Sequence, residues 1–359
     1  MAEFPISLDG ARRILLVKPS ALGDVVHALP VVATLRRRYP TILLDWLVEE
    51  ESAPLVQGHP AVAEVVVSGR RRWLNQLRRP REARGALREI SSFLSALRER
   101  RYDAVLDLQG LLKSALYVLA TRAPIRVGLA DGREGAPWVL THRVPVPAQP
   151  VHAVERYLAL AAAVGATDSV REFTIPIARH DLVIAEDLLA NCGRPRVVLH
   201  PAARWRTKLW EVDRWRKLAE TLAASGTAVI LTGSAADEAV AGEIMHGLQP
   251  PIRSLVGRLS LKQLAAVLQS VDLMITVDSG PMHVAAAVGT PVLALFGPTD
   301  PSRTGPLGLG GILRQPLPCS PCLQRKCRIA DTYRCMRDLE VGEVVRAADR
   351  LLSARLAEK

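Results

Sequence analysis

Residues 273–301, LMITVDSGPMHVAAAVGTPVLALFGPTDP, predict a strand, a tight turn, a short helix and a second strand. The runs 273–277 and 291–296 are apolar and rich in β-branched or aliphatic residues, which is typical of buried parallel strands. Residues 278–280 form the turn, and Pro281 suits the first turn of a helix because its missing N–H costs nothing there. A βαβ unit of this kind predicts a parallel α/β sheet.

The turn between these two strands is suited to an anion. A helix that begins at the carboxyl end of a parallel strand offers free backbone N–H groups and the positive end of its dipole. Gly280 has no Cβ to block a close approach. The turn therefore predicts a diphosphate cradle with His283 beside it. The alternative remains open that Asp278 only caps an ordinary helix.

The rest of the chain repeats the same alternation of apolar runs and helical segments, which predicts doubly wound parallel sheets. The expected strands are 13–19, 41–49, 63–67, 102–108, 125–129, 196–200, 228–232 and 252–256. A length of 359 residues suggests two domains. A linker at 167–180, with a short β-like run at 173–177, divides them into 1–178 and 179–359. A helix at 341–356 closes the chain and could pack back on the first domain.

Composition narrows the possible partners. No apolar run reaches the roughly 18 residues of a membrane span, and the first residues lack the apolar core of a secretory signal. A cytoplasmic protein is expected. The net charge is +11, with arginine clusters at 36–38, 70–72 and 98–101. Such a surface suits nucleic acid, an anionic membrane or a phosphorylated ligand, or is simply solvated. Without a nucleic-acid motif and with 4% aromatics, nucleic acid is not expected.

Six motifs in order carry a resemblance to a known family. They are KPSALGDVVHALP, DWLVEE, QGLLKSA, HPAARWRTKLW, DSGPMH and FGPTDP, and the resemblance runs from about residue 13 to residue 300. The chain resembles the ADP-heptose:lipopolysaccharide heptosyltransferases, glycosyltransferases of the GT-B fold, and most resembles their heptosyltransferase I branch. The resemblance implies two Rossmann-like domains facing across a cleft. The first would bind the acceptor and carry the catalytic base, the second would bind the nucleotide sugar, and catalysis would require no cofactor.

Asp24 matches the general base of that family. A sugar hydroxyl is a poor nucleophile until a base takes its proton in the transition state. Asp24 lies in the first strand–helix turn, where a carboxylate is favoured by the helix dipole. The resemblance implies inverting transfer of heptose from ADP-heptose to Kdo on Kdo-lipid A. The alternative for Asp24 alone is a plain capping residue.

The family's donor-binding positions map onto the second half of the chain. Lys208 would stabilise charge on the leaving diphosphate, Glu238 would bind the ribose and Leu259 would contact the adenine. Alanines stand at two positions where heptosyltransferase I tends to carry hydroxyl residues, so side-chain contacts to phosphate are missing there. The full donor set is Ala202, Ala203, Arg204, Lys208, Glu238, Leu259, Asp278, Ser279, Gly280 and His283.

Arg71, Arg72 and Arg133 match basic positions tied to acceptor binding, since Kdo carboxylates and lipid A phosphates need cations. A peripheral location on the cytoplasmic face of the inner membrane follows as an expectation. Two alternatives stay open: a relative that uses another nucleotide sugar or core acceptor, and a non-catalytic nucleotide- or lipid-binding protein. The presence of Asp24 favours an enzyme.

Four cysteines cluster near the end of the chain: Cys319, Cys322, Cys327 and Cys335. Stable disulfides are not expected in a cytoplasmic protein. Four thiolates could close a tetrahedral structural zinc site, and the C-x2-C start has the spacing of a zinc knuckle. The later gaps fit no familiar zinc motif, so reduced thiols and a redox-active pair remain alternatives.

Overall fold

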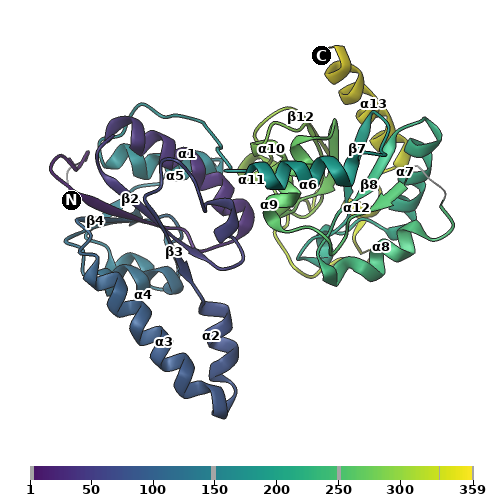
Figure 1. The fold of residues 1–359 in the computed structure, drawn as a ribbon. Coiled ribbons are helices and arrows are strands. Elements are labelled where there is room, and N and C mark those ends of the chain that lie inside the picture. Colours follow the sequence, from purple (N-terminus) through teal and green to yellow (C-terminus); the bar gives the residue numbers. More distant parts are fainter. Residues whose placement is uncertain (1–3, 147–150, 249–251, 331, 358–359) are drawn as a thin grey trace. The chain divides into compact units, whose positions relative to one another are not determined.

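The computed structural model describes residues 4–146, 151–248, 252–330 and 332–357. The chain separates into two compact units, residues 1–176 and 177–359 (Figure 1). The boundary falls inside the expected linker. Each unit contains one six-stranded sheet in which every pair of neighbouring strands is parallel.

The sheet of the first unit has the doubly wound strand order. Its strands are β1 (Arg13–Val17), β2 (Leu43–Glu49), β3 (Glu64–Ser68), β4 (Ala104–Asp107), β5 (Ile125–Leu129) and β6 (His142–Val144). They are arranged β3-β2-β1-β4-β5-β6, so the direction of winding reverses between β1 and β4. Ligands of doubly wound sheets bind outside the carboxyl ends of the strands at that switch point.

The helices of the first unit, among the described residues, are α1 (Leu22–Arg38), α2 (Arg70–Leu77), α3 (Pro80–Glu99), α4 (Leu112–Thr121) and α5 (Ala153–Ala163). Helices α1 and α5 pack together on one face, and α3 and α4 pack together on the other. Helices α2 and α3 form an antiparallel pair whose connecting end extends away from the sheet (Figure 1). The buried Leu97 and the half-buried Phe93 fasten α3 to the core.

The second unit repeats the doubly wound order. Its strands are β7 (Arg196–His200), β8 (Ala228–Leu231), β9 (Ile252–Ser254), β10 (Leu273–Val277), β11 (Val292–Phe296) and β12 (Gly310–Arg314), arranged β12-β11-β10-β7-β8-β9. Its helices are α6 (Arg179–Leu189), α7 (Val212–Ala224), α8 (Glu238–Met245), α9 (Leu261–Gln269), α10 (Gly280–Ala287), α11 (Pro301–Thr304), α12 (Arg334–Arg337) and α13 (Val341–Ala357). Its switch point lies between β7 and β10.

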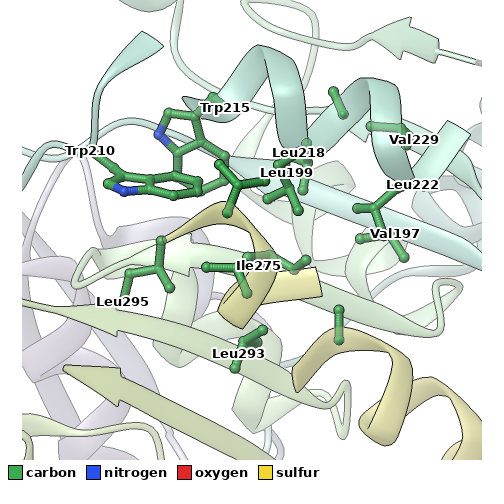
Figure 2. Close-up of a cluster of buried hydrophobic side chains, with 14 of the residues drawn as sticks. Val197, Leu199, Trp210, Trp215, Leu218, Leu222, Val229, Ile275, Leu293 and Leu295 are labelled. Carbon is green, nitrogen blue, oxygen red and sulfur yellow. The ribbon is translucent and has the colours of Figure 1, made fainter. Parts of the chain in front are cut away.

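Two tryptophans fill the core on one face of this second sheet (Figure 2). The rings of Trp210 and Trp215 meet edge to face with centroids 5.2 Å apart, a geometry worth about 1 kcal/mol beyond area burial. They pack over Leu199, Ile275 and Leu295, which lie on three neighbouring strands. This core fixes strands β7, β10 and β11, whose carboxyl ends carry the expected donor site.

Some elements differ from the sequence prediction. Residues 173–177 form no strand, whereas β6, β12 and α6 occur where no element was expected. The basic segment 70–101 is two helices, because Pro80 begins a new one at its first position. Helix α13 buries Val344, Ala348 and Leu352 in the core of its own unit. That α13 also packs on the first unit stays a prediction.

Candidate active site

The first unit carries Asp24 at the switch point of its sheet. Asp24 lies in the first turn of α1, directly after β1, and its carboxylate is about one-third exposed, at 37%. Oδ2 accepts a hydrogen bond from the backbone N–H of Ala21 at 3.2 Å and lies 3.8 Å from Nζ of Lys18. Among the residues that the structure describes, Oδ1 receives only a long hydrogen bond of 3.5 Å from the hydroxyl of Tyr157. One oxygen is therefore anchored and the other is nearly unengaged.

Two buried groups that sequence reasoning missed, Lys18 and Tyr157, contact Asp24, and a third, Asp107, interacts with Lys18. Burial lowers the pKa of Lys18, against the opposing charges of Asp24 and Asp107. Burial raises the pKa of Tyr157 well above its ordinary value, and the charge of Asp24 raises it further. Burial also raises the pKa of Asp107, although N–H groups from the next turn oppose this. Lys18 was detectable, since it ends the apolar run of β1, but Tyr157 comes from α5, which no local pattern links to this turn.

A second charged cluster lies at the carboxyl ends of β2 and β4. Glu49 is 2% exposed and receives Nε of Arg70 at 2.7 Å, Nε of Arg71 at 3.6 Å and Nζ of Lys113 at 3.6 Å. Burial lowers the pKa of Lys113, against the charge of Glu49. The nearby Ser20 hydroxyl also contacts this ammonium. This cluster was not expected as a unit from the sequence.

The three expected acceptor arginines are not equivalent. Arg71 pairs with Glu49 and Glu51, and Arg72 pairs with Glu50 and with Glu89. Arg133 is exposed and forms no ion pair within the described residues. Its backbone N–H donates to the carbonyl of Gly110 at 2.8 Å, which places it in the loop beside the end of β4.

The second unit brings Lys208 and Asp278 together across its switch point. Nζ of Lys208 lies 2.7 Å from Oδ2 of Asp278, and the hydroxyl of Thr299 donates to the same oxygen at 2.6 Å. Asp278 therefore does not cap α10, and the capping alternative for it is wrong. Ser279 stands at the N-cap without a side-chain capping bond, so no side chain caps the first N–H groups of α10. The helix start retains its capacity for an anion.

The other donor positions surround the same edge of the sheet. His283 is buried in the first turn of α10. Ala202, Ala203 and Arg204 follow β7, where Ala203 packs on the core and Arg204 is exposed. Glu238 begins α8, and a Cβ on Gly257 would lie 2.5 Å from its Oε1. Leu259, two residues beyond, is half-buried. The donor positions thus lie at the carboxyl ends of β7 to β10.

The cysteine segment lies beside these donor loops. The N–H of Leu323 donates to the carbonyl of Pro298 at 2.8 Å, and the hydroxyl of Thr207 donates to the carbonyl of Gln324 at 2.9 Å. Burial, together with the charges of the other three thiols, raises the pKa of Cys335 to about 11. Backbone N–H donors, led by that of Tyr333, lower the pKa of Cys327. The five cysteines of the chain are unpaired.

Known proteins similar to this chain belong to the family that the sequence motifs predicted. A model of glycosyltransferase family 9 (heptosyltransferase) matches residues 90–332. The lipopolysaccharide heptosyltransferase 1 of Pseudomonas aeruginosa is 38% identical over 89% of this chain and 88% of its own length. The enzyme of the same name from Escherichia coli is 33% identical over 82% of this chain and 91% of its own.

Solved structures agree with these relatives. The Escherichia coli heptosyltransferase WaaC with ADP aligns at a TM-score of 0.73 and 29% identity, covering 94% of this chain and 99% of that one. The Escherichia coli ADP-heptose heptosyltransferase II aligns at a TM-score of 0.74 and 26% identity, covering 95% and 99%. The resemblance, the GT-B fold class and the enzyme class expected from the sequence are confirmed. The chain belongs to glycosyltransferase family 9, the heptosyltransferases of the lipopolysaccharide core.

Proposed function

We propose that the protein transfers heptose from ADP-heptose to Kdo of Kdo-lipid A, with inversion, and that Asp24 is the general base. The observation that carries the proposal is the state of the Asp24 carboxylate. Oδ2 is anchored by a backbone N–H and lies near Lys18, while Oδ1 has among the described residues only the 3.5 Å contact with Tyr157, on a side chain that is 37% exposed. Oδ1 is then the oxygen that can accept a proton from a substrate hydroxyl.

In the proposed reaction, residues of this chain take up the proton and stabilise the leaving group. The proton of the acceptor hydroxyl passes to Oδ1 of Asp24 while the hydroxyl oxygen forms a bond to the anomeric carbon. The bond from that carbon to the diphosphate breaks, and ADP leaves. Lys208 and the uncapped N-terminus of α10 stabilise the charge that builds on the diphosphate. A structural relative, the Escherichia coli heptosyltransferase WaaC, has been solved with ADP, which supports this donor.

The test is a product assay with matched donors and acceptors. We expect ADP release and a lipid product heavier by one heptose when the protein is incubated with ADP-heptose and Kdo-lipid A. UDP-glucose as donor and lipid A without Kdo as acceptor should give neither. Turnover only with another nucleotide sugar or core acceptor would favour the related-transferase alternative. ADP-heptose binding without turnover on any acceptor would favour the non-catalytic one.

For the acceptor, we propose that Arg133, Arg71 and Arg72 bind its anionic groups. Arg133 has no carboxylate partner among the described residues, so its guanidinium is available at once. Arg71 and Arg72 would first have to break an ion pair with a glutamate, and this cost lowers the net free energy that they gain by binding the acceptor. Arg133→Ala should therefore raise the KM for Kdo-lipid A more than Arg72→Ala does. A larger effect of Arg72→Ala would contradict this ranking.

We also propose that the α2–α3 pair docks on the anionic inner leaflet. Eleven arginines and three glutamates lie between Arg70 and Arg101. In the part of the chain that the structure describes, Arg78, Arg81, Arg84 and Arg88 form no ion pair. Leu74 and Leu87 beside them are 46% and 58% exposed. No helix of the described residues is long and apolar enough to cross a bilayer, so contact would be peripheral. Each basic residue near an anionic surface contributes on the order of 1 kcal/mol.

Vesicle sedimentation tests this docking. The variant Arg81→Glu/Arg84→Glu/Arg88→Glu should lose binding to vesicles that contain anionic phosphatidylglycerol, while the wild type binds them at low salt but not neutral vesicles. The matched control Lys217→Glu/Arg346→Glu/Arg350→Glu has the same change in charge on exposed residues of the second unit. It should bind like the wild type. Equal loss in both variants would attribute binding to net charge and overturn the assignment to α2–α3.

For Cys319, Cys322, Cys327 and Cys335 we propose a structural zinc. Support comes from the sequence, which places all four thiols within 17 residues, and from the charges of the other three, which raise the pKa of Cys335. Among the described residues, no three His, Cys, Asp or Glu side chains form a ready-made metal site. Zinc would have to draw the thiolates together. About one zinc per chain by elemental analysis would support it, whereas four titratable thiols with no metal would leave the reduced-thiol alternative.

A further inference from the structure

The indole ring of Trp205 lies next to two cations. Nζ of Lys208 lies 4.7 Å from the ring centroid, and Cζ of Arg325 lies 5.2 Å from it. Both distances are within the range of cation–π attraction. Trp205 thus links the loop after β7 to a residue 120 positions later in the chain. The arrangement gathers a second positive charge beside the ammonium that binds the donor phosphate.

Hydrogen bonds hold the segment of Arg325 in place. Gln324 accepts the Thr207 hydroxyl at 2.9 Å, and Leu323 donates its N–H to Pro298 at 2.8 Å. The hydroxyl of Ser320 donates to the carbonyl of Gly297 at 2.5 Å. Thr207 follows β7, whereas Gly297 and Pro298 follow β11. Strand β10, which carries the donor turn, lies between those two strands. The segment is therefore tied on both sides of the donor turn.

The two cations differ in what already engages them. Lys208 lies 2.7 Å from the carboxylate of Asp278, so part of its charge is already compensated. Arg325 is exposed and has no ion-pair partner within the described residues. A diphosphate has two charged groups and several acceptor oxygens. The ammonium of Lys208, which is already paired with Asp278, cannot balance all of that charge by itself. A guanidinium can donate two parallel N–H bonds to a phosphate, which an ammonium cannot do.

We propose that Arg325 is a second diphosphate-binding residue of the donor site, and that Trp205 positions it there. This inference rests on the proposed ADP-linked donor. Arg325 donates to oxygens of the β-phosphate, the group that becomes the terminal phosphate of the leaving ADP, while Lys208 engages the same diphosphate. Trp205 acts through Arg325 and Lys208 and touches no reacting atom. The extended segment after β12 thereby completes the donor site.

Calorimetry with ADP and AMP tests the assignment. Arg325→Ala should weaken ADP binding by about tenfold, the scale of one charge-assisted hydrogen bond, and AMP binding by less than about twofold. Arg325→Lys should recover part of the loss because it keeps the charge but not the paired donors. Arg328→Ala is the matched control, since Arg328 is an exposed arginine of the same segment without an ion pair among the described residues. It should bind both nucleotides like the wild type.

Trp205 has its own readout. Trp205→Leu should weaken ADP binding at least as much as Arg325→Ala does, and adding Arg325→Ala to Trp205→Leu should change little more, because Trp205 acts through Arg325 and Lys208. Trp205→Phe keeps a ring face for both cations and should keep most of the affinity. In steady-state kinetics, Trp205→Leu should raise the KM for ADP-heptose and leave the KM for the acceptor unchanged.

The outcomes separate this inference from the proposed function. Unchanged ADP affinity in Arg325→Ala, with a clear loss in Lys208→Ala, would overturn the role of Arg325 and leave the donor assignment intact. Equal losses for ADP and AMP would place Arg325 away from the β-phosphate and also overturn it. Absence of ADP binding by the wild-type protein would instead remove the proposed donor.

Discussion

Nζ of Lys208 lies 2.7 Å from Oδ2 of Asp278, so the cation expected to bind phosphate already holds a carboxylate from the neighbouring strand. The pair is largely buried, with side-chain exposures of 16% and 9%. Thr299 donates to the same carboxylate oxygen. Asp278 thus fixes the ammonium at the switch point of the second sheet, where a diphosphate would meet both the ammonium and the start of α10.

This pairing predicts a coupled response to mutation. Lys208→Ala should weaken ADP binding by about 10- to 100-fold, because a charge-assisted contact to phosphate is lost. Asp278→Asn should weaken it by about threefold through loss of the lysine's position, but should change little in the Lys208→Ala background. Calorimetry with ADP on the wild type, the two single variants and the double variant gives the coupling free energy between the two residues. Additive effects of the two substitutions would contradict a positioning role for Asp278.

The stability of the second unit should depend on its tryptophan pair. Trp215→Ala should lower the free energy of unfolding by about 3–5 kcal/mol, since a fully buried ring would leave a cavity between α7 and the sheet. Trp138 is 82% exposed and supplies the matched control. Trp138→Ala should change stability by no more than about 0.5 kcal/mol. Denaturant unfolding followed by circular dichroism measures both, and similar losses would contradict the assignment of the core.

Acid should destabilise the second unit through His200. Burial lowers the pKa of His200 from 6.5 to about 4. As pH falls from about 6.5 to about 4, His200 becomes protonated in the unfolded chain but stays neutral in the folded one. The free energy of unfolding therefore falls by on the order of 3 kcal/mol. Above pH 6.5 both states are neutral and the full stability is present.

His200→Gln tests this pH dependence. Unfolding midpoints at pH 7.5 and pH 5 should differ less in the variant than in the wild type, because glutamine does not titrate. Parallel losses in the two proteins would assign the acid sensitivity to other groups.

The sequence predicted the elements with strong local patterns. The predicted strand at 273–277 matches β10, and the predicted strand at 291–296 matches β11 to within one residue. The predicted turn at 278–280 ends where α10 begins. Strand β6 was missed because three residues, His142–Val144, carry no periodicity. Strand β12 begins with glycines, which resemble a loop; a Cβ at Gly310 would lie 2.0 Å from the carbonyl of Val292.

The sites were harder to predict because they are built across strands. Asp24 and Lys208 could be named from their motifs, but their partners could not. Tyr157 reaches Asp24 from α5, 133 positions later. Arg325 reaches Trp205 only because the segment after β12 returns over β11. Such contacts depend on strand order and on chain return, which no local pattern encodes.

The central claim is that Asp24 is the general base, and Asp24→Asn tests it most directly. Asparagine keeps the shape of the side chain and a carbonyl oxygen that can accept from the N–H of Ala21. Its amide group stands where Oδ1 of Asp24 lies and cannot take a proton there. In single-turnover reactions with ADP-heptose and Kdo-lipid A, the chemical rate should fall by about 10²- to 10⁴-fold. Calorimetry should find the affinity for ADP unchanged within about twofold, since the donor residues lie in the second unit. A single-turnover rate in Asp24→Asn within about threefold of the wild type would contradict the account.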